Sequence, residues 1–233
     1  MSASRTGPLV SIVVPVLDEA GAIPALLDDL AELYGRFEVV VADGGSRDAS
    51  AELAREHPLG PRVVTARGRA RQLNAGAGAA RGEALVFLHA DTRLPYDAYT
   101  SLCRALRDHE IVGGNFALRF DGGDRFSRAL GAWYAVQRRL GIYYGDSAVW
   151  VRRGTFEALG GYRDLAIMDD YDFVRRLERR GRTVCLPGPA VTSARRWQRL
   201  GLGRTIASWV VIRWLYLAGV PPQRLSALYR TVR

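Results

Sequence analysis

Short apolar segments alternate with helical ones along the first half of the chain, and this alternation constrains the fold more than any other feature. Residues 9–17 and 37–43 are nearly continuous runs of β-branched and aliphatic side chains, as in parallel strands buried on both faces. Between them, isoleucine and leucine recur at helical spacing from Ile23 onward, and Gly35 closes the segment. The same reasoning predicts strands over 62–65 and 84–90 and helices over 48–56 and 69–80. Repetition of strand, helix and strand predicts an α/β fold: a Rossmann-like, doubly wound, mostly parallel sheet with helices on both faces.

The second half is more mixed, and it ends in a helical tail. The pattern predicts strands over 113–120 and 147–153, and helices over 124–140 and 169–181. From about residue 203 two helical stretches follow, divided by Pro221 and Pro222. We therefore expect one domain over 1–202, with halves over about 8–95 and 96–202, and a C-terminal tail over 203–233.

The chain is strongly basic, but its basicity is a weak guide to a partner. The formal net charge is +9, and all 33 cationic residues are arginine. They are scattered, and the bias towards Arg, Ala and Gly is also typical of a GC-rich genome. No helix-turn-helix, RNA-binding strand signature or interleaved basic and aromatic patch accompanies them. We expect no specific nucleic-acid partner.

The cysteines and the apolar segments indicate a cytoplasmic location. Cys103 and Cys185 lie far apart, so the sequence has no disulfide framework and no zinc-site spacing. The N-terminus shows no signal-peptide pattern. Residues 206–220 form the longest apolar stretch, which is short for a membrane span and contains Arg213. We expect this stretch to pack in the core or in a dimer interface; the alternative is an in-plane contact with a membrane.

Polar clusters end three of the predicted strands. They are Asp18-Glu19, Asp43-Gly44-Gly45-Ser46 and His89-Ala90-Asp91. The formation of turns and helix caps can explain each cluster on its own. In an open α/β sheet, however, ligands bind beyond the carboxyl ends of the strands. Three such clusters at one edge therefore predict a ligand site there.

Several segments resemble family 2 glycosyltransferases in the order in which that family carries them. "SIVVPVLDEAGAI" resembles the opening strand, "VVVADGGSRDAS" the second-strand nucleotide motif and "FLHADTRLP" the metal motif. "RRGTFEALGGYRD" followed by "MDDYDFVRRLERRG" resembles the acceptor-side segment with its Glu-Asp pair. The match covers roughly residues 9–200. Within the family, "GRARQLNAGA", "FLHADTRLP", "YGD" and "TSARRW" together resemble a bacterial subgroup associated with arsenosugar biosynthesis.

The resemblance implies a GT-A fold, a nucleotide-diphosphate sugar donor, a divalent cation (Mn²⁺ or Mg²⁺) and an inverting displacement. It makes residues 8–95 the nucleotide-binding half and 96–202 the acceptor half, with a small molecule or a lipid phosphate as the acceptor. The chain departs from the family pattern in three places. Asp18 replaces Asn, Asp169-Asp170 replaces Glu-Asp, and His89 stands where the first carboxylate of the metal motif would be.

Asp170 is the candidate catalytic base, because inverting transfer needs a group that deprotonates the acceptor hydroxyl. It shares a helical stripe with Phe173, Val174 and Leu177, whereas Asp169 and Asp172 lie off that stripe. The alternative is that Asp170 only favours the helix N-terminus through the helix dipole. Through the resemblance, Asp169 is expected to bind substrate.

Asp91 is the candidate metal ligand. Period-two geometry puts His89 and Asp91 on one side of their strand, if the strand stays regular to its end. Mg²⁺ and Mn²⁺ prefer oxygen ligands, and one carboxylate with diphosphate oxygens and waters can suffice. His89 could add a nitrogen ligand, bind the ribose or a phosphate, or be satisfied by backbone in a turn.

The remaining candidate substrate-binding residues come from the resemblance. Glu19 and Asp43 would line the nucleobase and ribose pocket, and Arg71 would contact the diphosphate. Arg196 and Trp197 resemble the segment with which processive relatives hold the acceptor and diphosphate; the alternative is a capping Arg beside a core Trp. Asp146 would contact the acceptor.

Two other functions remain as alternatives. Sugar-phosphate nucleotidyltransferases also place acids at strand ends, but they usually carry a glycine-rich basic signature after the first strand, which "PVLDEAGAI" lacks. The other alternative is a non-catalytic module that binds nucleic acid through its basic surface.

Overall fold

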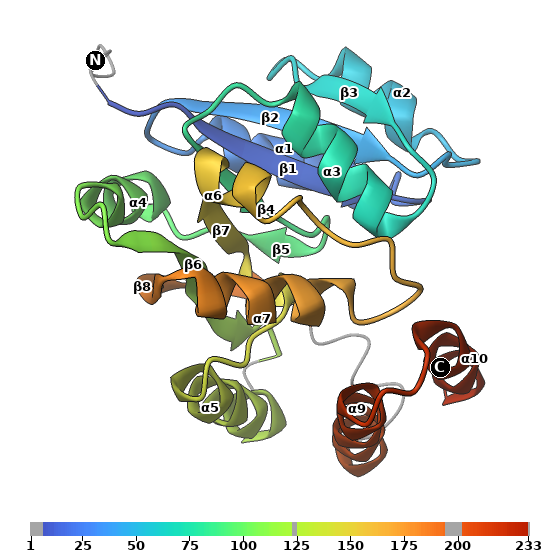
Figure 1. The fold of residues 1–233 in the computed structure, drawn as a ribbon. Coiled ribbons are helices and arrows are strands. Elements are labelled where there is room, and N and C mark those ends of the chain that lie inside the picture. Colours follow the sequence, from blue (N-terminus) through green and yellow to red (C-terminus); the bar gives the residue numbers. More distant parts are fainter. Residues whose placement is uncertain (1–6, 123–124, 194–201, 233) are drawn as a thin grey trace.

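An eight-stranded sheet organises the computed structural model, which describes residues 7–122, 125–193 and 202–232 (Figure 1). The strand order is β3-β2-β1-β4-β7-β6-β8-β5. The strands are β1 (Val10–Val16), β2 (Phe37–Asp43), β3 (Arg62–Thr65), β4 (Ala84–Phe87), β5 (Thr92–Arg93), β6 (Ile111–Phe120), β7 (Val149–Arg152) and β8 (Arg182–Thr192). The helices are α1 (Ile23–Ala31), α2 (Ser50–Glu56), α3 (Arg69–Ala79), α4 (Ala98–Leu106), α5 (Arg125–Arg139), α6 (Arg153–Ala158), α7 (Asp169–Arg180), α9 (Leu202–Leu217) and α10 (Pro222–Val232), with a 3₁₀ turn η1 (Gly145–Ser147).

Parallel pairing dominates the sheet, as the sequence predicts. β1 pairs in parallel with β2 and β4, β2 with β3, and β6 with β8. The pairs β4–β7, β6–β7 and β5–β8 are antiparallel. The predicted α/β class is confirmed, with helices on both faces.

The strand predicted over 84–90 is shorter in the structure. It ends at Phe87, and only the backbone N–H of Leu88 continues the ladder by donating to Val13. The chain then turns, and the N–H of Thr92 donates to the carbonyl of His89. The long strand β8 was not predicted, because its sequence "RTVCLPGPAVT" contains two prolines and a glycine that read as a loop.

The central strands bury both faces, so the core has two main parts. Val14 and Ile12 pack with Leu27 on the side of α1 and α4, whereas Val13 packs with Leu73 of α3 on the opposite side. Burying Ile12 and Val13 fully stabilises the fold by roughly 1.5–3 kcal/mol for each side chain. This two-sided burial explains why the predicted strands lack polar alternation.

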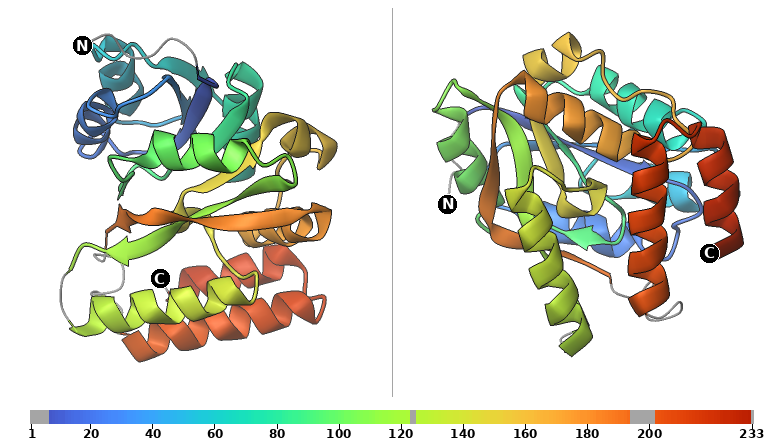
Figure 2. Two further views of the ribbon diagram at one scale, coloured as in Figure 1. Left: turned by 90° about the vertical axis from the view of Figure 1, so that its left-hand side faces the viewer. Right: turned by 60° about the horizontal axis from the view of Figure 1, so that its bottom comes forward.

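Helices α5, α9 and α10 form a further layer beyond β6 and β8 (Figure 2). Leu130 of α5 packs with Phe120, Ile206 and Trp209 in a small apolar cluster. The predicted stretch 206–220 therefore packs through one face of α9 only, while Trp214 on the same helix is exposed. None of the helices in the described part of the chain combines the length and hydropathy that a membrane span requires.

Candidate active site

Asp43 ends β2 beside the end of β1, where the sequence predicts a ligand site. Its carboxylate accepts the backbone N–H groups of Gly45 and Ser46, so it shapes its own turn. Gly45 has a φ of +88°, a conformation that favours glycine. Glu19 follows β1 with an exposed side chain, and its backbone N–H donates to the hydroxyl of Ser50. The strand-end position of both acids agrees with the prediction, and their contact with a nucleotide stays a prediction.

Gln72 holds the ends of β1 and β2 together and was missed by sequence reasoning. Its side chain is buried, and its amide nitrogen donates to the carbonyls of Val16 (2.8 Å) and Ala42 (2.7 Å). The signal in the sequence was one amide within a stripe of α3 that includes Leu73 and Ala77. A buried amide needs partners, so its position next to core residues indicated a structural role.

Arg69 of α3 is the centre of the site. Its Nη1 donates to Oδ1 of Asp169 at 2.7 Å, and its Nη2 lies 2.9 Å from Nε2 of His89 and 3.7 Å from Oδ2 of Asp170. Burial by itself lowers the pKa of the Arg69 guanidinium, but Asp169 and Asp170 outweigh it, so the net shift is upward. Arg69 thus joins the starts of α3 and α7 and the turn after β4.

The contact with Arg69 fixes the tautomer of His89. A guanidinium nitrogen can only donate, so Nε2 of His89 accepts and the neutral ring carries its proton on Nδ1. The Nε2 lone pair is then directed at Arg69. This geometry argues against Nε2 of His89 as a second metal ligand while Arg69 holds this position.

Asp170 lies at the start of α7 and faces the same cluster. Its Oδ2 accepts the backbone N–H of Gly145 at 3.0 Å, its Oδ1 accepts the N–H of Tyr171 at 2.7 Å, and its side chain is 14% exposed. The inward face of α7 is wider than the predicted stripe. Asp169 and Asp172 are more buried than Asp170. Arg69 pairs with Asp169, and Arg163 and Arg176 pair with Asp172, so both buried carboxylates have cationic partners. The predicted apolar stripe is buried as expected: Phe173, Val174 and Leu177.

This arrangement leaves no room for a side chain at position 145, which is a glycine. A Cβ at this position would lie 2.5 Å from Nη2 of Arg69 and 2.8 Å from Nε2 of His89. Any side chain would displace one of these groups. The glycine therefore allows a backbone N–H to approach Asp170 beside a guanidinium.

Asp146 follows in η1, with one carboxylate oxygen that is buried and has no hydrogen-bond partner in the described part of the chain. Burial raises the pKa of Asp146 to about 7. The negative charges of Asp170 and Asp91 also raise this pKa, whereas the Tyr134 hydroxyl and Arg69 lower it. Asp146 therefore takes up a proton at a much higher pH than an ordinary aspartate does. An acid of this kind is a candidate for proton exchange or for binding a polar ligand.

Asp91 is exposed at the edge of this cluster, close enough for its charge to act on Asp146. Its placement on the same side as His89 required a strand that stays regular to its end, and the structure does not meet this condition, because β4 ends at Phe87 and the chain turns. Among the residues that the structure describes, no three His, Cys, Asp or Glu side chains are arranged to hold a metal ion. A cation at Asp91 would need further oxygen ligands from substrate and water.

Arg71 does not join the cluster. Its guanidinium pairs with Asp164 at 2.6 Å, and both side chains are largely exposed. Residues two apart on a helix point about 200° apart, so only one of Arg69 and Arg71 can face the site. The structure places Arg69 there instead of the predicted Arg71. The predicted residues Arg196 and Trp197 lie outside the described residues.

Comparison with known proteins identifies the family. Residues 11–163 match the model of glycosyl transferase family 2. A PGL/p-HBAD biosynthesis glycosyltransferase of Mycobacterium bovis is 31% identical over 199 residues, which cover 80% of this chain and 73% of the relative. An undecaprenyl-phosphate 4-deoxy-4-formamido-L-arabinose transferase of Pseudomonas aeruginosa is 34% identical over 171 residues, which cover 67% of this chain and 50% of the relative.

Solved structures show the same fold. A mannosyltransferase from Pyrobaculum calidifontis in complex with GDP-Man and Mn²⁺ superposes with a TM-score of 0.67 at 23% identity, over 92% of this chain and 65% of that one. TarS of S. aureus in complex with UDP-GlcNAc gives a TM-score of 0.64 at 15% identity, over 80% of this chain and 58% of that one. The chain thus spans less than two thirds of both solved proteins. The fold, the family model and the relatives agree: the chain belongs to glycosyl transferase family 2 and is a glycosyltransferase.

Proposed function

We propose that the protein transfers a sugar from a nucleoside-diphosphate sugar to an acceptor hydroxyl with inversion, and that Asp170 is the base. One observation carries this proposal. The Asp170 carboxylate, the Gly145 peptide and the Arg69 guanidinium come from three separate segments and meet at the carboxyl edge of the sheet. That edge is where an open α/β sheet binds its ligands.

The geometry around Asp170 suits proton abstraction. The Gly145 N–H and the Tyr171 N–H hold its two oxygens, and the side chain stays partly open to solvent. In an inverting displacement, the acceptor oxygen forms a bond to the anomeric carbon while the bond from that carbon to the diphosphate oxygen breaks. The hydroxyl proton passes to Asp170, and the electron pair of the broken bond leaves with the diphosphate.

The residues present fit a divalent cation shared between protein and substrate. Asp91 offers an exposed carboxylate next to the cluster, and Mg²⁺ often binds through one or two carboxylates plus substrate phosphates and waters. We therefore retain Asp91 as the residue that would hold Mn²⁺ or Mg²⁺. When bound, such a cation neutralises charge on the departing diphosphate.

The donor and acceptor are proposed by class. Two solved neighbours contain GDP-Man and UDP-GlcNAc, which supports a nucleoside-diphosphate sugar without choosing the base. Glu19 and Asp43 are the proposed nucleoside contacts, within a nucleotide-binding half over 8–95 and beside an acceptor half over 96–202. One relative is named for undecaprenyl phosphate, so a lipid-linked acceptor stands beside a small molecule. The resemblance to the arsenosugar-associated subgroup stays a prediction.

Family membership contradicts the alternative of a non-catalytic nucleic-acid-binding module. No feature of the described residues favours the nucleotidyltransferase alternative.

Calorimetric titration with UDP, GDP, ADP and CMP, each with and without Mn²⁺, would identify the donor nucleotide. With that nucleotide, Asp170→Asn should abolish transfer while the Kd changes by no more than about twofold, because the change removes a base but little volume. Asp164→Asn, at an exposed carboxylate, is the matched control and should keep both properties. Weaker nucleotide binding with normal turnover in Asp170→Asn would exclude Asp170 as the base.

A further inference from the structure

The helical layer beyond β6 and β8 exposes more apolar surface than packing requires. On α9, Val211, Trp214 and Leu217 are exposed at helical spacing, and Trp214 is 65% exposed. The opposite side of the same helix packs Trp209 and Ile212 into the protein. The neighbouring helix α5 and the turn directly after it expose a second apolar set: Trp133, Val136 and Leu140. We call these six side chains the α5–α9 face.

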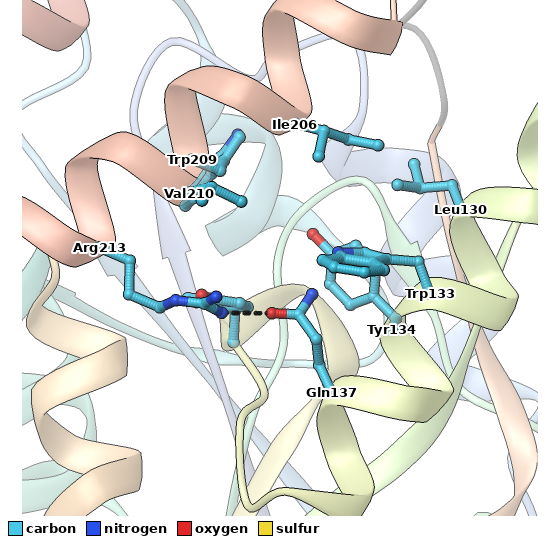
Figure 3. Close-up of a pocket in the computed structure, with 9 residues that line it drawn as sticks. Leu130, Trp133, Tyr134, Gln137, Ile206, Trp209, Val210 and Arg213 are labelled. Atoms are coloured by element: carbon cyan, nitrogen blue, oxygen red, sulfur yellow. Dashed lines mark hydrogen bonds between the residues drawn. The ribbon is translucent and has the colours of Figure 1, made fainter.

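The two helices are held together, so the α5–α9 face is one surface. A groove between α5 and α9 is lined by Trp133, Tyr134, Val210 and Arg213, among others (Figure 3). Within it, the guanidinium of Arg213 donates to the side-chain oxygen of Gln137 at 2.5 Å. The exposed residues flank this groove, since Trp133 lines it and Val211 and Trp214 directly follow lining residues. Exposed apolar surface concentrated on adjacent helices is typical of an interaction site.

The charge around this face is one-sided. Residues 179–233 hold 11 arginines and no Asp or Glu, whereas residues 1–178 hold 22 arginines and 24 carboxylates. Helix α5 also lacks acidic residues, and α5 and α10 expose four arginines: Arg125, Arg128, Arg139 and Arg224. Among the described residues, the helices α5, α9 and α10 therefore expose arginines and no carboxylates beside the α5–α9 face.

We propose that the α5–α9 face docks on an anionic lipid surface, with the helices lying in the plane of the interface. Apolar side chains that include Trp, with Arg beside them, are the composition that binds the boundary between headgroups and acyl chains. A second copy of the chain would bring two basic faces together, and their like charges would repel each other. Nucleic acid would match the charge but leave the aliphatic side chains in water.

The position of the face adds a functional reason. The rings of Tyr134 on α5 and Trp209 on α9 lie 6.3 Å and 5.6 Å from that of Tyr144, which precedes Gly145 in the chain. The docked helices are thus one layer of side chains away from the candidate site. An acceptor carried in the lipid surface would be presented close to that site, although docking itself does not depend on the proposed transfer.

Sedimentation of the full chain with lipid vesicles tests the proposal. The vesicles are phosphatidylcholine alone, or phosphatidylcholine mixed in equal parts with phosphatidylglycerol. We expect binding to the mixed vesicles that weakens as salt rises, and at least about tenfold weaker binding for Trp133→Ser/Trp214→Ser. Arg128→Ser/Arg139→Ser should weaken binding and reduce its salt dependence. Tyr96→Ser, which removes a 75% exposed aromatic ring outside the face, is the matched control and should bind as the parent does.

Three results would overturn the proposal. The first is no binding to mixed vesicles by protein whose circular dichroism shows it to be folded. The second is equal binding by the double tryptophan variant and the Tyr96 control. The third is a dimer in sedimentation velocity that the double tryptophan variant abolishes, together with no vesicle binding, which would assign the face to a second copy.

Discussion

Two arginines on one helix allow a direct test of what burial does to an ion pair. Arg69 and Arg71 both belong to α3, and each pairs with an aspartate at 2.6–2.7 Å. The Arg69 and Asp169 side chains are 35% and 7% exposed, whereas those of Arg71 and Asp164 are 65% and 55% exposed. Replacement of each arginine by glutamine removes the same charge from very different surroundings.

The expected losses of stability differ several-fold. Breaking a buried pair leaves an uncompensated charge and costs about 3–5 kcal/mol, and we expect about 3 kcal/mol for Arg69→Gln because Arg69 is one-third exposed. An exposed pair contributes at most about 1 kcal/mol, so Arg71→Gln should cost about 0.5 kcal/mol. Urea unfolding with a slope of about 3 kcal/mol/M would show midpoint shifts of about 1 M and under about 0.3 M.

The pH dependence gives an independent check. Burial raises the pKa of Asp169, and loss of Arg69 removes the main opposing effect. A carboxyl whose folded pKa lies above its unfolded value binds more protons when folded, so its contribution to stability falls as pH rises. The stability deficit of Arg69→Gln should therefore be smaller at pH 5 than at pH 8.

A double variant completes the experiment. Adding Asp169→Asn to Arg69→Gln should restore at least about 1 kcal/mol, because the unpaired carboxylate is then gone. Equal losses for Arg69→Gln and Arg71→Gln, or no recovery in the double variant, would refute the buried-pair reasoning.

Three further predictions concern single side chains. Burial raises the pKa of Asp146 to about 7, so the parent loses stability as the pH rises from 5 to 8. The free energy of unfolding of Asp146→Asn, measured relative to the parent in metal-free buffer, should therefore increase by about 2–3 kcal/mol over this range. A pH-independent difference in urea unfolding would contradict this. Gly145→Ala should lower kcat at least about tenfold at similar stability, since its Cβ would lie 2.5 Å from Nη2 of Arg69; unchanged kcat would show that the cluster tolerates displacement. Asp91→Asn should remove any effect of Mn²⁺ on the nucleotide Kd, and an unaltered Mn²⁺ response in calorimetry would place the cation elsewhere.

The order of strands and helices in the first half follows from local sequence. β1, β2, β3 and α3 lie within one or two residues of their predicted bounds, because each is a run of local periodicity between turn residues. The ligand edge was also predictable, since Asp43 ends β2 and Glu19 lies three residues after the end of β1, and the parallel pairing of these strands puts their carboxyl ends together. Asp170 could be singled out from the resemblance and from its place at the start of α7.

Contacts between distant segments decided the rest. Arg69 reaches Asp169 across 100 positions in the sequence, and Gln72 joins strand ends that lie 56 and 30 positions away. Helix periodicity shows that Arg69 and Arg71 face different directions, but it does not show which direction is the site. Likewise β8, with its prolines and glycine, becomes a strand because β6 supplies a parallel partner along most of its length. Local periodicity determines which segments become strands and helices where that periodicity is regular. Contacts with partners distant in the sequence, through burial and hydrogen bonding, determine which side chains form the site.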